Sequence, residues 1–360
     1  PLRLALANLL LETFGDSNGA LEQLRSALVV DPDDEDARLL TGRALEARDE
    51  VEAAIRAYRS LLIDRLSCVD AARGLARIMG ARGHHPVVAM ASSVLELAGV
   101  ASPSEYEHVD GFDRAGAPRG RLVVLDLPLL EEDERDGEDL VAVERFLTPL
   151  LQHFGSVHKL PLSATVGASH PAAAAARQIG SAFGLATVQL SIENGRWPAV
   201  AGLGRPVPLR VSAELAARPE EAPFRFWVGR ALGAAATCGS LLELLDDGAL
   251  ELMLKALAIP KPESSEVAQQ RKQLLRAMPR KLRKQVEQSD VPKLRRGRWE
   301  YYRQLERQRA DRVGLLTSSN PRVALRQLED IPGPRLRRLL EFGLSVPFSE
   351  YYRLLWGGRG

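Results

Sequence analysis

The sequence contains only two cysteines, Cys68 and Cys238, and they lie in distant segments. Two separated thiols exclude a disulfide framework and a cysteine-based zinc knuckle, and they are typical of a reducing compartment, so we expect a cytoplasmic protein. The longest apolar runs, such as residues 122–130, are too short to cross a bilayer. No signal-peptide pattern opens the chain. It begins at Pro1 rather than Met, so an upstream signal or further repeats stay open.

Histidine is also scarce, and its distribution excludes a class of site. The last 190 residues contain none of the six histidines, which are His84, His85, His108, His153, His158 and His170. A zinc site with two histidines therefore cannot form within that part of the chain. The sequence also lacks a nucleotide-binding P-loop, a dinucleotide-binding glycine fingerprint and a Gly-x-Ser-x-Gly nucleophile elbow, so we expect no cofactor.

An excess of one charge sign is absent as well. The formal net charge is +1, with 26% charged and 45% apolar residues. This composition is typical of folded protein, and no overall field attracts the chain to nucleic acid or to a membrane. We expect no membrane span and no nucleic acid as the main partner.

What the first 101 residues do contain is a period of 34 residues. Small or medium residues recur in register at four positions, which are Asn8, Gly42 and Ala76; Ala20, Ala54 and Val88; Leu24, Tyr58 and Ser92; and Ala27, Leu61 and Leu95. Small residues are needed where two antiparallel helices approach closely, and Pro32 closes the first unit because proline cannot extend a helix. The pattern predicts stacked helical hairpins.

These residues resemble the tetratricopeptide family, with Val88 and Ser92 as departures in the third unit. The resemblance implies an array whose concave groove binds a peptide or helix of another protein. Helix positions that face inward in such arrays fall on Asn8 and Arg38, which we therefore expect to line the groove. We also expect Ala20 and Ala54 to be buried between paired helices.

A connector is expected over residues 102–170. Residues 122–127 predict a buried strand, residues 131–139 form an acidic run that reads as a solvated loop, and residues 139–154 have the apolar spacing of a helix. A helix over 172–183 and strands over 186–192 and 207–211 follow, with glycines and prolines between the strands that suit a hairpin or meander.

Two strings in the third segment, residues 171–331, carry a second resemblance. The first is Phe224-Arg-Phe-Trp-Val-Gly-Arg-Ala-Leu-Gly-Ala234, and the second is Arg307-Gln-Arg-Ala-Asp-Arg-Val-Gly-Leu315. Their order is similar to that of zinc metallopeptidases of the HtpX and BepA type. The resemblance places the two histidine ligands on Arg230 and Ala234, the general base on Ala231 and the third ligand on Arg307.

The resemblance therefore implies a degenerate, inactive peptidase frame. A guanidinium repels Zn²⁺ and cannot be deprotonated near neutral pH. If the alignment of the second string were shifted by one residue, Glu306 would take the place of the third ligand, but it would lie on a helix face turned by about 100°. The family's supporting aspartate falls on Asp311. We expect an Arg230–Asp311 ion pair to replace the metal as the crosslink between the two helices.

Basic residues dominate residues 271–312. The densest part includes Lys281, Arg283, Lys284, Arg295, Arg296 and Arg298, and it is followed by Trp299, Tyr301 and Tyr302. Such a stretch is either a solvated helix pair facing an acidic partner or a phosphate-binding surface. Residues 332–360 predict a basic amphipathic helix and an aromatic tail that docks within the chain.

The expected fold is mainly α, with a helical-repeat array and an α+β domain that holds a small sheet. The expected function is a non-catalytic protein-binding scaffold. Two alternatives stay open: a hydrolase with an unrecognised C-terminal site, and a nucleic-acid-associated protein that uses residues 271–302.

Overall fold

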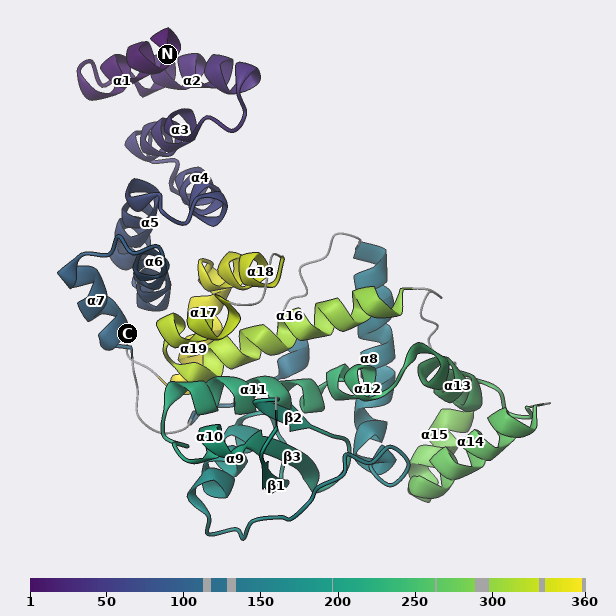
Figure 1. Cartoon of the computed structure of the whole chain (residues 1–360). Helices are drawn as coiled ribbons and strands as arrows, with labels where there is room; N and C mark the ends of the chain where they lie inside the picture. The colour runs from purple at the N-terminus through teal and green to yellow at the C-terminus, as the bar shows by residue number, and fades with distance from the viewer. Residues whose placement is uncertain are drawn as a thin grey trace. The chain divides into compact units, whose positions relative to one another are not determined.

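The computed structural model describes residues 1–112, 118–127, 134–195, 197–262, 264–288, 298–329 and 334–357. It is mainly helical with one small sheet, as the sequence predicts (Figure 1). No helix among these residues has the length and apolar character needed to span a bilayer. The chain divides into two compact units, and each is described separately below.

Unit 1 combines the described residues of 1–114 with those of 319–353. Its N-terminal part is a succession of antiparallel helices, and its C-terminal part adds three more, although α19 runs on past Arg353. The helices are α1 (Leu2–Glu12), α2 (Ser17–Val30), α3 (Glu35–Ala47), α4 (Val51–Asp64), α5 (Val69–Ala81), α6 (His85–Leu97), α7 (Pro103–Asp110), α17 (Pro321–Glu329), α18 (Pro334–Gly343) and α19 (Val346–Trp356).

The first six helices form three hairpins. The second helices of these hairpins begin at residues 17, 51 and 85, which matches the 34-residue spacing in the sequence. Ala20 and Ala54 are fully buried, as predicted. Tyr58 on α4 inserts between Gly42 on α3 and Gly74 on α5, where added Cβ atoms would lie 2.6 and 2.8 Å from its ring. Small residues thus make room for larger ones at these crossings.

The C-terminal helices of unit 1 pack on the hairpins. Glu96 at the end of α6 is paired with Arg322 and Arg326 of α17, and Arg337 of α18 pairs with Asp64 of α4. The sequence predicts a segment boundary between residues 331 and 332. In the structure, residues 319–329 already belong to the unit that contains the helical hairpins.

The predicted docking of the C-terminal aromatics within the chain is confirmed. In unit 1, Phe348 and Tyr352 are buried, and their rings contact Phe342 and Phe112 respectively. Residues 331–333, which precede α18, lie outside the described part.

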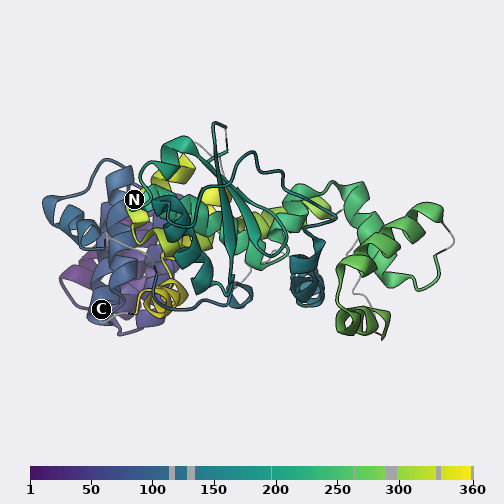
Figure 2. The same ribbon diagram turned by 90° about the horizontal axis from the view of Figure 1, so that it is seen from below.

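Unit 2 combines the described residues of 115–318 with 354–357. Its elements are η1 (Val124–Asp126), α8 (Glu134–Phe154), α9 (Pro171–Ala182), β1 (Val188–Glu193), β2 (Ala199–Ala201), β3 (Val207–Ser212), α10 (Ala213–Ala216), α11 (Ala222–Ala236), α12 (Gly239–Leu244), α13 (Asp247–Ala258), α14 (Ser265–Ala277), α15 (Arg280–Gln288) and α16 (Trp299–Ser318). Figure 2 shows α13, α14 and α15 gathered at one end of the unit, away from the sheet.

The sheet has the order β1-β3-β2. The two predicted strands, β1 and β3, pair in parallel and therefore form no hairpin with each other. The antiparallel hairpin in the sheet joins β3 with β2, a strand that the sequence did not predict. Val207, Leu209 and Val211 on β3 are buried in strict alternation. This alternation is the pattern of a strand with one face against a core.

Two predictions for residues 122–139 are wrong. Residues 122–127 contain a short 3-10 helix instead of a strand. Leu122, Val124 and Leu127 are buried, but the described residues offer this segment no strand partner, so burial alone produced the apolar pattern. The expected acidic loop is also shorter, because α8 already begins at Glu134. Residues 131–133 lie outside the described part.

Because Ala54 is fully buried at a helix crossing, Ala54→Leu should overpack the second hairpin and lower the free energy of unfolding by about 1–3 kcal/mol. The midpoint of urea unfolding of the full chain measures this loss. Ala53→Leu, at a half-buried position on the same helix, controls for the added side chain. Equal midpoints for the two variants would contradict the close packing at Ala54.

Candidate functional site

The two strings that resemble a peptidase lie on α11 and α16, which pack directly against each other. Glycines allow this approach: a Cβ added to Gly233 on α11 would lie 2.8 Å from the Val313 side chain, and one added to Gly314 on α16 would lie 2.9 Å from the Phe226 ring. The Thr317 hydroxyl also donates to the carbonyl oxygen of Arg225, 3.0 Å away, across the contact. Larger residues at these glycines would separate the helices.

The predicted ion pair between the two helices is present. Nε of Arg230 donates to Oδ1 of Asp311 at 2.7 Å. The Asp311 side chain is only 1% exposed, and the Arg230 side chain is 19% exposed. The guanidinium also lies 5.7 Å from the centre of the Trp227 ring, within the range of a cation–π contact. A charged hydrogen bond therefore connects α11 and α16.

The other positions of the predicted degenerate site, Ala231, Ala234 and Arg307, do not form one site with this ion pair. Ala231 is buried and Ala234 is half-buried, and their methyl groups offer no acid–base or metal-binding chemistry. Arg307 lies in another charged group at the surface, where it pairs with Glu243 at 2.6 Å and with Glu300 at 2.9 Å. The structure brings Arg230 and Asp311 together but places Arg307 among different partners.

A buried charged cluster that the sequence did not predict lies beside this helix pair. It joins Glu144 of α8 with Glu306 and Arg309 of α16, and none of the three side chains is more than 2% exposed. Nη1 of Arg309 donates to a carboxylate oxygen of each glutamate. Buried charges are costly unless they are paired and hydrogen-bonded. The two carboxylates can be buried here because the guanidinium of Arg309 pairs with both of them.

Thr237 and Cys238, between α11 and α12, complete the cluster. The Thr237 hydroxyl donates to Glu306, and the Cys238 thiol lies 3.9 Å from Oε1 of Glu144. Burial and the adjacent carboxylates raise the pKa of the Cys238 thiol well above its ordinary value. The protonated thiol is a weak nucleophile, and its burial keeps it away from substrates.

Two carboxylates facing one guanidinium leave one negative charge in excess. Burial, and after it the charge of Glu306, raise the pKa of Glu144 to about 9. Oε2 of Glu144 has no hydrogen-bond partner within the described residues, which adds to the cost of its ionised form. Burial beside a second carboxylate thus favours the protonated form of Glu144.

The same cluster is the one group in the described residues whose atoms could share a metal ion. The candidate ligand atoms of Glu144, Cys238 and Glu306 lie within 4.8 Å of one another. Arg309 already provides a positive charge between the two carboxylates, so a metal would have to displace or repel this guanidinium. The arrangement fits a self-neutralised core better than a metal centre.

A pattern in the sequence could have revealed the cluster. Glu144 falls in the apolar stripe of its helix, four residues after Leu140 and three before Leu147. Glu306 and Arg309 interrupt the stripe of α16 in the same way. Charged residues at core positions of an amphipathic helix indicate a buried polar network, provided that their partners can be identified.

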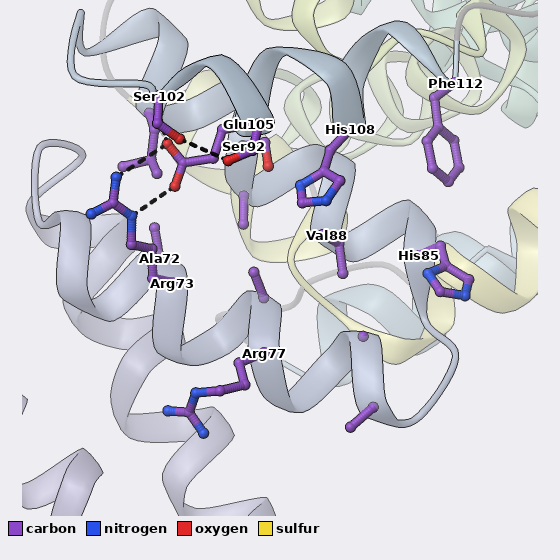
Figure 3. Close-up of a pocket in the computed structure, with 16 residues that line it drawn as sticks. Ala72, Arg73, Arg77, His85, Val88, Ser92, Ser102, Glu105, His108 and Phe112 are labelled. Carbon is purple, nitrogen blue, oxygen red and sulfur yellow. Dashed lines mark hydrogen bonds and ion pairs between the residues drawn. The ribbon is translucent and has the colours of Figure 1, made fainter.

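Unit 1 contains a separate candidate site, a pocket of about 640 Å³ formed by α5, α6 and α7. Its floor is made of small residues, among them Ala72, Ala76 and Ser92. Figure 3 shows Arg73 and Glu105 at one end and His85 and Phe112 at the other, with His108 between them. The pocket is open to solvent, and it combines an apolar floor with charged and aromatic walls.

The charged wall of the pocket is held in place by its own contacts. Nε of Arg73 donates to Oε1 of Glu105 at 2.8 Å, and Glu105 also accepts a hydrogen bond from the backbone N–H of Ser102, which caps α7. These donors lower the pKa of Glu105 despite its burial. Arg77 pairs with Glu46 and keeps 61% of its side chain exposed. Each of the two arginines of this wall is thus paired with a glutamate of the chain.

Neither predicted groove residue lies in this pocket. Asn8 is exposed on α1. Arg38 on α3 faces α4, where it pairs with Asp64 at 2.6 Å and donates to the Ser60 hydroxyl. The pocket belongs to the third hairpin and α7, so it is distinct from the groove of the array that Asn8 and Arg38 are expected to line, and that expectation stays a prediction.

The predicted basic stretch is described only in part. Lys281, Arg283 and Lys284 lie exposed on α15. The guanidinium of Arg298 lies 4.7 Å from the centre of the Tyr301 ring. Arg295 and Arg296 lie outside the described residues.

Comparison with protein-family models, with curated proteins and with solved structures found no match for this chain.

The Arg230–Asp311 contact should contribute measurably to stability. Arg230→Met removes the cation from a buried carboxylate, and we expect unfolding to become easier by about 1–3 kcal/mol, between the ranges of exposed and fully buried pairs. In a double-mutant cycle with Asp311→Leu, the coupling should exceed about 1 kcal/mol. As a control, Arg307→Met removes a surface ion pair on α16, the helix of Asp311, and should lower the free energy of unfolding by only about 0–1 kcal/mol. Additive losses from Arg230→Met and Asp311→Leu would mean that the two residues do not stabilise each other.

The raised pKa of Glu144 makes stability depend on pH. The ordinary carboxyl value is 4.5 and the folded value is about 9, so the folded state binds the proton more tightly between these values. The stabilisation that this proton gives to the folded state is complete below pH 4.5 and is lost as the pH rises towards 9. Over that range the free energy of unfolding should fall by up to about 1.4 kcal/mol per pH unit. Glu144→Gln, which keeps the shape without the titration, should flatten that slope in urea unfolding measured from pH 5 to 9. Identical slopes in both proteins would show that Glu144 is not the titrating group.

Proposed function

We propose that this chain is a non-catalytic scaffold that binds a peptide segment of another protein in the pocket of α5, α6 and α7. The observation that carries the proposal is the pocket itself, which is open, about 640 Å³ in volume and lined by charged and aromatic side chains over a floor of small residues. Ligand sites combine an apolar surface with a few fixed polar groups in this way.

The arrangement of the hairpins supports the assignment to a tetratricopeptide-like array. Three hairpins follow one another at the 34-residue spacing, and small residues are buried at their crossings, as at Ala20 and Ala54. One helix pair cannot bury its apolar face alone, so such pairs stack and leave grooves along the stack. The pocket lies in the third hairpin, where α7 adds a further wall.

The charges of the pocket favour an acidic peptide. Arg73 and Arg77 are more than half exposed, whereas Glu105 is 10% exposed and is already used by Arg73 and by the cap of α7. Both guanidinium groups already pair with a glutamate, Arg73 with Glu105 and Arg77 with Glu46, but their exposed sides keep further N–H donors for an incoming carboxylate. Phe112 and His85 at the other end favour a neighbouring apolar or aromatic side chain.

For unit 2 we propose a structural role, a peptidase-like frame without peptidase chemistry. Arg230–Asp311 connects α11 with α16, and the Glu144–Glu306–Arg309 cluster attaches α8 to the same helix. The thiol of Cys238 and the hydroxyl of Thr237 are both buried. These contacts favour the scaffold over the alternative of a hydrolase, because the reactive groups of the cluster satisfy one another.

Selection of peptides from a random displayed library against the full-length chain tests the pocket. We expect the selected peptides to be rich in Asp and Glu beside an apolar residue. Arg77→Gln should weaken their binding by about 5- to 20-fold, the loss of one charged hydrogen bond, as measured by fluorescence anisotropy. Ala76→Phe, which fills the floor, should abolish binding.

The matched control is Arg56→Gln, which removes an exposed arginine on α4 that does not line the pocket. It should bind the peptides as tightly as the unaltered chain. If Arg77→Gln and Ala76→Phe also bind normally, the peptide site is not this pocket.

A further inference from the structure

The short helices α14 and α15 carry a concentration of positive charge that the net charge of the chain conceals. Residues 264–288 contain seven lysines and arginines but only two glutamates, whereas the complete sequence has a net charge of +1. Six of the seven are exposed and define what we call the basic surface, made of Lys272, Arg276, Arg280, Lys281, Arg283 and Lys284. The seventh, Arg271, is buried and donates to the carbonyl oxygens of Ala256 and Leu257 at the end of α13.

The basic surface differs from several arginines of unit 1, which pair with carboxylates of the chain. Arg38, Arg73 and Arg322 each pair with a carboxylate. None of the six residues of the basic surface has an ion pair or hydrogen bond with another part of the chain that the structure describes. Several are also three or four residues apart on one helix, where like charges repel. Such a surface is stabilised when an anionic partner binds.

The folding of α15 determines which way its charges point. Val286 is buried and Leu282 is half-buried, and both pack against the apolar core of unit 2. This side of the helix is therefore unavailable to a membrane, and the described part of the basic surface has no exposed large apolar residue that could insert among lipids. The four cations of α15 remain on the solvent side of a rigid helix.

We propose that the basic surface binds the phosphate backbone of duplex nucleic acid. The cations at positions 280, 281, 283 and 284 lie within about one and a half turns of one helix, close enough together to contact several phosphates of one backbone. No exposed aromatic ring lies among the described residues of the surface, so it lacks the stacking platform that unpaired bases would use. Binding is therefore independent of base sequence.

The near-neutral total charge does not oppose this binding. At physiological salt, charges farther away than about 8 Å are largely screened, so a duplex experiences the local cations rather than the sum over the chain. The expectation that nucleic acid is not a partner rested on that sum and on the lack of a known nucleic-acid motif beside the basic stretch. The inference also stands apart from the peptide pocket, which lies in unit 1.

Binding of the full-length chain to a labelled DNA duplex of about 24 base pairs, followed by fluorescence anisotropy between 50 and 200 mM KCl, tests the proposal. With four to six phosphate contacts, the logarithm of the affinity should fall against the logarithm of the salt concentration with a slope of about −4 to −5. Removing two contacts with Arg280→Gln and Arg283→Gln should reduce that slope by about 2 and weaken binding by about 50-fold near 0.1 M salt.

The matched control is Arg25→Gln with Arg56→Gln, which removes two exposed arginines from α2 and α4 and should leave both values unchanged. Thermal unfolding followed by circular dichroism should be equal in both double variants, because all four side chains are exposed. Absence of duplex binding at 50 mM KCl, or equal losses in the two double variants, would overturn the proposal. Tighter binding to a single strand of equal length, to polyglutamate or to phosphatidylserine vesicles would assign the surface to another anion and would equally overturn it.

Discussion

The contact between α11 and α16 is the constraint on which the rest of unit 2 depends. Gly233 and Gly314 bring the two helices so close that little side-chain volume separates them. Asp311 is almost completely buried there, and a buried carboxylate without a cation would be costly. Arg230 provides that cation from the facing helix. The two residues therefore depend on each other, because either charge without its partner would destabilise the folded state.

The buried cluster extends the same principle to α8. Arg309 pairs with Glu144 and Glu306 at once, and burial raises the pKa of Glu144 so that its protonated form is favoured. Replacing such a network by apolar residues is often neutral or stabilising, so its presence does not by itself indicate high stability. The cluster instead fixes how three parts of unit 2 are positioned. Its groups come from α8, from α16 and from the junction of α11 with α12, and each group depends on partners from the other parts.

The sequence predicted best those features that depend on local spacing. The helical hairpins, the burial of Ala20 and Ala54 and the helix over residues 139–154 follow from periodic apolar or small residues. The Arg230–Asp311 pair was predictable because the resemblance placed both residues on facing helices. The assignment of residues 122–127 to a strand failed because buried apolar residues alternate there without a strand partner.

Features that depend on distant parts of the chain were not predictable in this way. The return of residues 319–329 to the helical hairpins depends on Arg322 and Arg326 reaching Glu96, more than 220 residues earlier in the chain. Likewise, the buried cluster required Glu144 and Arg309 to meet across 165 residues. The pocket was not predictable either, because it depends on α7, which the repeat pattern did not include.

The central claim is that an ion pair, and not a metal, connects the two motif helices. Metal analysis of the purified full-length chain by mass spectrometry, combined with thermal unfolding in the presence and absence of a chelator, tests it most directly. The account predicts no stoichiometric zinc and a melting temperature that the chelator does not change. One zinc per chain, together with a lower melting temperature in the chelator, would contradict it.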